Sequence, residues 1–128
     1  IEEHQAKAES IERSLSRCTV EDYESVIEGC MLAGTHRFNI LLHQGGSPPE
    51  QDVMHAEFLS VAVRRKTRVT MPSVLEALDD IERARTLHVR GDLPGGPQAA
   101  RRALECLDIL RSAACQRLPV TGKTMAAV

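Results

Sequence analysis

The first part of the chain carries one narrow apolar stripe in an otherwise polar segment. Between residues 2 and 17, apolar side chains recur at spacings of three and four, with Glu and Arg between them. The stripe consists of Ala8, Ile11, Leu15 and Cys18. This period is that of an α-helix with one buried edge. A narrow stripe needs a neighbouring helix to cover it, so the pattern predicts an N-terminal helix packed against a second one.

The next segment predicts a long helix that is apolar on more than one face. "TVED" at residues 19–22 is a variant of the capping box, so we expect a helix from Val20 to His43. Its broad face comprises Val20, Tyr23, Ile27, Cys30, Met31, Phe38, Leu41 and Leu42. A second stripe follows Val26, Ala33 and Ile40, and Leu32 lies nearly opposite the broad face. Such a helix is either central in its domain or contacts another molecule.

A turn then separates this helix from the next. "QGGSPPEQ" at residues 44–51 predicts a left-handed cap at Gly45 or Gly46, followed by a capping box from Ser47 to Glu50. We expect the new helix to run to about residue 66. Its apolar residues form two faces, Met54, Phe58, Val61 and Ala62 on one and Ala56, Leu59 and Val63 on the other.

Two further helices complete the predicted fold. One begins at Thr70 or Pro72 and ends near Val89, and the last begins at Pro97 after the loop "RGDLPGGP". The chain therefore predicts an all-α protein, a four- to five-helix bundle with long amphipathic helices. We expect one domain over residues 1–118 and a flexible C-terminal tail over residues 119–128.

Composition narrows the class of protein. At 128 residues the chain suits one core, and its three aromatic residues favour closely packed aliphatic helices over sheets. The net charge of −2 argues against nucleic acid as a partner, and no apolar run is long enough for a membrane. Four cysteines without CxxC pairs indicate free thiols and a cytoplasmic location.

The histidines are the first candidates for chemistry. His36 and His43 are seven residues apart, which is about 10.5 Å along a helix, whereas helical metal ligands usually stand four apart. His55 lies across the turn and could approach His43. Because His36 and His43 are expected to point away from the broad core face, we predict exposed or interface histidines, no metal and no cofactor.

No catalytic set can be built from the remaining polar residues. No spacing suggests a Ser-His-Asp or Cys-His arrangement, and no acidic pair stands apart from the solvated helix faces. "GKT" at 122–124 lacks the upstream glycine of a phosphate loop, since Arg117 stands there, and "RGD" at 90–92 fits a turn. We therefore predict no catalytic residue and no enzyme.

A basic group at Arg64, Arg65, Lys66 and Arg68 supports an alternative function. The stretch "RRKTRVTMPSVLEAL" at 64–78 resembles the second loop and third helix of histone-fold proteins, although Ser73 stands where that family commonly has an acidic residue. The resemblance implies a DNA-associated module that uses these four cations. The competing interpretation is a capped turn between helices whose arginines pair with Glu76 or Asp79.

A second resemblance concerns the whole chain. The long helix ending "THRFNILLHQ", the Gly-rich turn and the following amphipathic helix are similar to the bacterial anti-activators that bind LuxR-type quorum-sensing regulators. This resemblance implies a dimeric, non-enzymatic protein. Such a protein sequesters a transcription factor by occupying its dimerisation or DNA-binding surface.

The surplus apolar faces support the same class of function, since contiguous exposed apolar surface usually marks a protein interface. We therefore predict a protein-binding regulator, a homodimer whose partner is a transcription factor. The predicted interface comprises Val26, Leu32, His36, Ile40, His43, His55, Leu59 and Val63.

Overall fold

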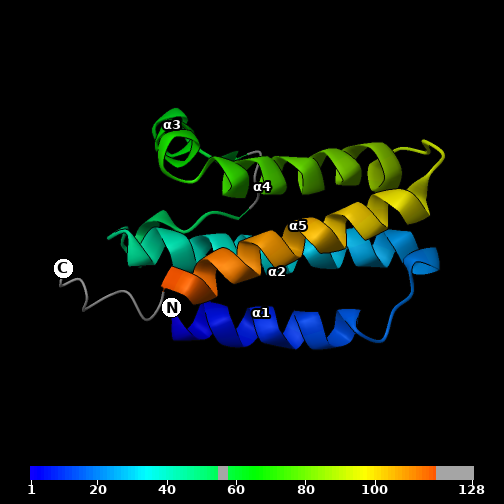
Figure 1. Cartoon of the computed structure of the whole chain (residues 1–128), viewed down its shortest axis with the longest axis horizontal. Helices are drawn as coiled ribbons and strands as arrows, with labels where there is room; N and C mark the ends of the chain where they lie inside the picture. Colours follow the sequence, from blue (N-terminus) through cyan, green and yellow to red (C-terminus); the bar gives the residue numbers. More distant parts are fainter. Residues whose placement is uncertain (55–57, 118–128) are drawn as a thin grey trace.

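The computed structural model describes residues 1–54 and 58–117. Its helices are α1 (Glu2–Leu15), α2 (Tyr23–Gln44), α3 (Val61–Thr70), α4 (Pro72–Ala84) and α5 (Gly96–Arg117) (Figure 1). The described residues contain no strand, so the predicted all-α bundle is confirmed. The predicted tail, residues 119–128, lies outside the described part of the chain, as does His55.

Helix α2 is the centre of the bundle and packs against α1, α4 and α5. Figure 1 shows α1 and α4 on opposite sides of the pair formed by α2 and α5, with α3 seen end-on beside the start of α4. The N-terminus lies at the same end of the bundle as the end of α5. The sequence left open whether α2 is central or touches another molecule, and the fold makes it central.

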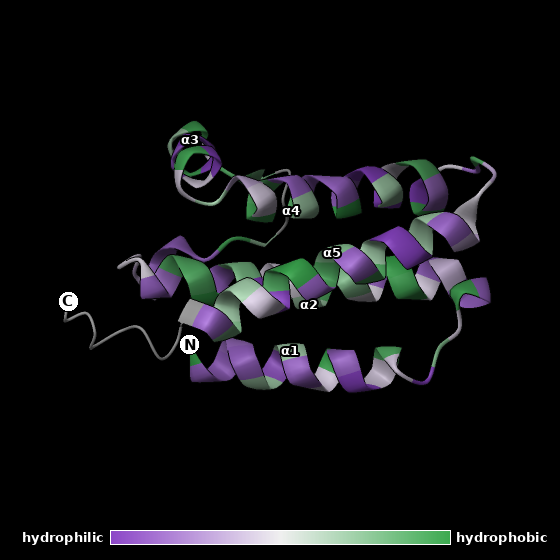
Figure 2. Ribbon diagram, viewed as in Figure 1, coloured by the Kyte–Doolittle hydropathy of each residue, from purple (hydrophilic) through white to green (hydrophobic). Residues whose placement is uncertain are grey.

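The second stripe of α2 is covered by α1. Val26 and Ile40 are 1% and 0% exposed, and a Cβ added at Gly29 between them would lie 2.6 Å from Leu15 Cδ2 of α1. Helix α1 in turn buries Ala8 and Leu15 and is hydrophilic over most of its ribbon (Figure 2). The prediction that Val26 and Ile40 form a partner interface is therefore wrong, because the apolar stripe of α1 occupies that face.

The broad face of α2 meets α5 and α4. A Cβ added at Gly34 would lie 3.0 Å from Leu110 of α5 and 3.6 Å from Ile81 of α4, so the absence of a side chain brings three helices together. The largest fully buried apolar side chains are Val26, Ile27, Cys30, Met31, Phe38, Ile40, Leu78, Ile81, Cys106 and Leu110. The core is thus aliphatic apart from one phenylalanine.

Local signals predicted the ends of α2. Thr19 forms the expected capping box with Asp22, ahead of a 3₁₀ turn, Val20–Asp22. After α2, Gly46 takes the left-handed conformation with a φ of 101°. A non-glycine residue would be strained there, so one of the two predicted cap positions is confirmed.

The helix predicted over residues 48–66 is wrong for residues 48–54. Residues Pro49–Gln51 form a single 3₁₀ turn, and α3 starts only at Val61. The cap of α3 is Ser60, whose hydroxyl accepts a hydrogen bond from the Val63 N–H at 3.1 Å. A side chain of α2 explains why the chain is not helical around Val53. The Asn39 amide donates to the Val53 carbonyl and accepts from the Val53 N–H, both at 2.8 Å, and so takes both backbone groups that a helix would use.

The helices predicted from Pro72 and Pro97 are confirmed. Helix α4 has Pro72 in its first turn and continues through a π-helical turn, Arg85–Arg90, close to the predicted end at Val89. Helix α5 begins at Gly96, which is buried against Tyr23. A Cβ at Gly96 would lie 2.4 Å from Tyr23 Cδ1, so this corner has no room for a side chain.

Candidate functional site

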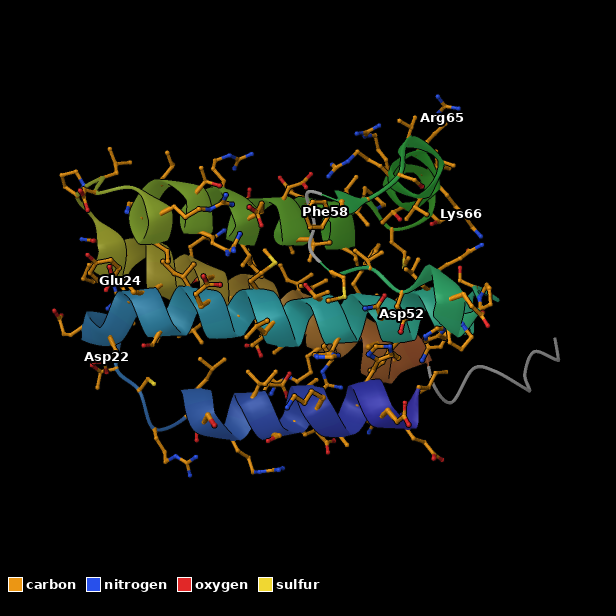
Figure 3. All side chains as sticks on the ribbon, turned by 180° about the vertical axis from the view of Figure 1, so that it is seen from behind. Asp22, Glu24, Asp52, Phe58, Arg65 and Lys66 are labelled. Carbon is orange, nitrogen blue, oxygen red and sulfur yellow. The ribbon has the colours of Figure 1, made fainter. Side chains whose placement is uncertain are left out.

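Three segments bring polar side chains together at one end of the bundle. The group consists of His4 in the first turn of α1, His36 and His43 in α2, and Asp52 in the loop after α2, and we name it the His4–Asp52 cluster. Figure 3 shows Asp52 beside the last turns of α2, and its contact with His4 places it on the side that faces α1. The antiparallel course of α1 and α2 places His4 opposite the last turns of α2.

Each carboxylate oxygen of Asp52 is in contact with a nitrogen of a different histidine ring. His4 Nε2 lies 2.8 Å from Oδ2, and His43 Nε2 lies 2.8 Å from Oδ1. The two rings stack with centroids 5.4 Å apart and an interplanar angle of 25°. One ligand atom from each of these three residues lies within 4.8 Å of the other two, so together they could hold a metal ion.

The other nitrogen of each ring is also engaged. His43 Nδ1 lies 2.8 Å from the carbonyl oxygen of Ser47, which can only accept, so Nδ1 carries the hydrogen. A neutral His43 therefore aims a lone pair from Nε2 at Asp52 Oδ1. Two lone pairs 2.8 Å apart repel, so this contact needs a cation, a proton or a metal ion, between the two atoms.

His36 forms the inner edge of the cluster. Its Nδ1 lies 2.9 Å from Nδ1 of His4, so one ring donates and the other accepts. Burial lowers the pKa of His36, and electrostatic interaction with His4 and Lys7 lowers it further against the opposing effect of Asp52. The His36 ring therefore binds a proton less readily than an unperturbed histidine.

The predicted histidine positions need correction. His36 and His43 do not point outward, since both are half-buried and hydrogen-bonded within the cluster. Sequence reasoning missed His4 and Asp52. The signal for His4 was available, because it extends the stripe of Ala8 and Leu15 by one turn toward the N-terminus. Asp52 carried no comparable signal, because Asn39 sets the path of its loop.

Residues 53–54 and 58–71 form a second candidate site. Val53, Leu59 and Val63 pack against the core, so Leu59 and Val63 of the predicted interface are half-buried. The same two stretches also include apolar side chains with large exposed fractions, which are Met54 at 73%, Phe58 at 65%, Val61 at 74% and Val69 at 77%. We name these four residues, with Arg65, Lys66 and Arg68, the α3 surface.

The basic group is divided by the fold. Arg64 donates hydrogen bonds at 2.8 and 3.1 Å to the two carboxylate oxygens of Asp79, which is the pairing that the capped-turn interpretation predicts. Together with the charge of Asp79, these bonds raise the pKa of Arg64. Arg65 and Lys66 project outward from α3 (Figure 3), and Arg68 is also exposed. Three cations therefore remain on the α3 surface.

The α3 surface borders a small groove. Its volume is about 160 Å³, and it lies between the end of α2 and α3, lined by Leu41, Leu42, Val63, Thr67 and Met71 among others. Leu32 of the predicted interface lies elsewhere on α2 and is 47% exposed. Those predicted interface residues that the structure describes are thus not brought together into one surface.

No family model, curated protein or solved structure matches the chain. Within the described residues, no helix is both long enough and apolar enough to cross a lipid bilayer.

Proposed function

We propose that the chain is a non-enzymatic regulator that binds another protein through the α3 surface. The observation that carries this proposal is the exposure of Val61 and Val69 on a helix that packs chiefly against α4. Exposed aliphatic side chains rimmed by arginine are typical of protein interfaces. The expected partner surface is apolar with an acidic rim.

The resemblance to anti-activators of LuxR-type regulators gives this proposal a specific form. The partner is then a cytoplasmic transcription factor, and the chain masks one of its functional surfaces. DNA-binding surfaces are basic and would repel Arg65, Lys66 and Arg68. The charge of the α3 surface therefore favours the dimerisation surface of the regulator as the part that is masked.

A homodimer would need another face. In a two-fold dimer the same patch meets itself, and the three cations of the α3 surface would then lie close together. Leu32, the exposed member of the predicted α2 interface, is the better candidate for self-association.

The test uses purified LuxR-type regulators from the source genome and their promoter DNA. Adding the chain should abolish the mobility shift of one regulator at a stoichiometric ratio. The variant Val61→Asp with Val69→Asp should lose this effect, whereas Leu93→Asp, at a residue 51% exposed in the loop before α5, should keep it. If the chain leaves every regulator bound to its DNA, or the double variant acts like the parent, the proposal is wrong.

The alternative is association with DNA through the cations of the α3 surface. It predicts a mobility shift of DNA by the chain alone that weakens steeply with salt. Replacing Arg65, Lys66 and Arg68 by Gln should remove that shift. The pairing of Arg64 with Asp79 leaves fewer cations for this function than the sequence indicated.

A further inference from the structure

We propose that the His4–Asp52 cluster binds a divalent transition-metal ion such as Zn²⁺, with His4 Nε2, His43 Nε2 and the Asp52 carboxylate as its protein ligands. The geometry that carries the proposal is the convergence of two imidazole nitrogens on one carboxylate. Imidazole and carboxylate are common zinc ligands.

The two ligand histidines have the outer hydrogen bonds that a metal site needs. A metal-bound imidazole usually donates its other N–H to a carbonyl, a carboxylate or another acceptor, which fixes the tautomer. His43 donates from Nδ1 to the Ser47 carbonyl at 2.8 Å. His4 Nδ1 lies 2.9 Å from His36 Nδ1, so His4 can donate this outer hydrogen bond to the tautomer of His36 that has its proton on Nε2. Both Nε2 atoms are then unprotonated and face the Asp52 carboxylate.

A bound metal ion would also remove the repulsion between His43 Nε2 and Asp52 Oδ1. With Nδ1 protonated toward Ser47, His43 Nε2 and Asp52 Oδ1 are both lone-pair donors at 2.8 Å. A divalent ion accepts both lone pairs. Tetrahedral coordination at ordinary zinc distances separates ligand atoms by roughly 3.3 Å. The two nitrogen–oxygen contacts of 2.8 Å are shorter than this and would lengthen by about half an ångström. The ligand atoms of the three residues lie within 4.8 Å of one another, so they are already gathered around one position.

The exposure of the three ligands and their number are both compatible with a bound zinc ion. Asp52 has a side chain 32% exposed, while the His4 and His43 side chains are 16% and 11% exposed. An ion can therefore enter from the side of Asp52 and be held against two shielded imidazoles. Three protein ligands leave one tetrahedral position for water.

The proposed ion would join three parts of the chain that are distant in sequence. His4 belongs to α1, His43 to α2, and Asp52 to the loop that leads to the α3 surface. Because the ligands meet only in the folded chain, metal binding is linked to folding. This inference does not depend on the proposed function of the α3 surface.

The test is a titration of the chelator-treated chain with Zn²⁺ by calorimetry, together with thermal unfolding. The chain should bind one Zn²⁺, and its Tm should rise. Asp52→Asn and His4→Gln should each lower the affinity by more than tenfold and remove the rise in Tm. His36→Phe should weaken binding by about tenfold, because it removes an outer hydrogen bond. Asp92→Asn, at an exposed carboxylate in the loop before α5, is the matched control and should bind like the parent.

Circular dichroism checks that each variant is folded before its affinity is compared. Substituting Co²⁺ distinguishes the proposed ligands from the four free thiols, since thiolate ligands add an intense charge-transfer absorption. A Co²⁺ spectrum without that absorption, lost in Asp52→Asn, supports the site. The proposal is overturned if no Zn²⁺ binds, if the ligand variants bind as tightly as the control, or if the thiolate absorption appears.

Discussion

Arg37 of α2 donates two hydrogen bonds to the carboxylate of Glu12 in α1, from Nε at 3.1 Å and from Nη2 at 2.8 Å. The Arg37 side chain is 3% exposed and that of Glu12 is 15% exposed. Burial lowers the pKa of Arg37, but the hydrogen bonds and charge of Glu12 outweigh it and raise the pKa overall. The pair holds α1 over the second stripe of α2, which would otherwise be exposed.

Glu12→Ala should therefore destabilise the protein strongly. Removing one partner of a buried pair leaves the other charge without compensation, at a cost of about 3–5 kcal/mol in the free energy of unfolding. Urea unfolding followed by circular dichroism measures the change. The matched comparison is Asp79→Ala, which breaks the Arg64–Asp79 pair, where both side chains are about one-third exposed, and should cost less than about 1 kcal/mol. Equal losses for the two variants would contradict this reasoning.

The stability of the fold should decrease as the pH falls through the titration range of histidine, in part because of His36. Its pKa is lowered in the folded protein, first by burial and then by His4 and Lys7, with Asp52 acting in the opposite direction. Between the folded and unfolded pKa values, the unfolded chain binds a proton that the folded chain does not, so stability falls as pH decreases.

The measurement is the free energy of unfolding between pH 5 and pH 8, roughly the range in which histidine titrates. His36→Gln should show a weaker loss of stability toward acid than the parent chain. An unchanged slope would mean that the surroundings of His36 do not lower its pKa. Chelator in every buffer separates this effect from metal binding.

The four thiols should differ in reactivity. Burial raises the pKa of Cys30 to about 12, with further contributions from Cys106 and Glu12. Burial also raises the pKa of Cys106. Because the thiolate is the reactive form, a disulfide reagent should modify exposed Cys115 in the native protein, and Cys30 and Cys106 only after unfolding. Cys115→Ser should remove the fast phase, and rapid modification of Cys30 in the native protein would contradict the buried core.

The contact between Gly96 and Tyr23 should appear as energetic coupling. Gly96→Ala places a Cβ 2.4 Å from the Tyr23 ring and should cost about 1–3 kcal/mol, as overpacking does. In a Tyr23→Ala background the same change should cost less, with a coupling free energy of about 0.5–3 kcal/mol. Gly45→Ala is the control, because its Cβ would make only ordinary contacts at 3.5 Å. Additive losses at positions 23 and 96 would contradict the steric explanation.

The fold was predictable where local signals mark the ends of helices. Proline at residue 72 and the Thr19 capping box are read correctly from a few neighbouring residues. The path of the chain after Asp52 could not be predicted in this way. The backbone of Val53 is held by the side chain of Asn39, which is fourteen residues away in the sequence. An amide in the middle of a helix gives no sequence signal that it binds a loop.

The candidate site was less predictable for a similar reason. The stripe of α1 and the second stripe of α2 were both identified, but a periodic pattern does not show that two stripes cover each other. Val26 and Ile40 therefore looked like surplus surface. Once α1 is placed antiparallel on α2, His4 must lie near His36 and His43, and the cluster follows.

The close approach of Gly96 to Tyr23 also has an evolutionary consequence. Neither position can change freely while the other keeps its residue, since any side chain at 96 occupies the space of the aromatic ring. Homologous chains should therefore retain glycine at 96 wherever position 23 is aromatic, and should lose both together. A correlated pair of this kind would mark membership of the same fold even where little other sequence identity remains.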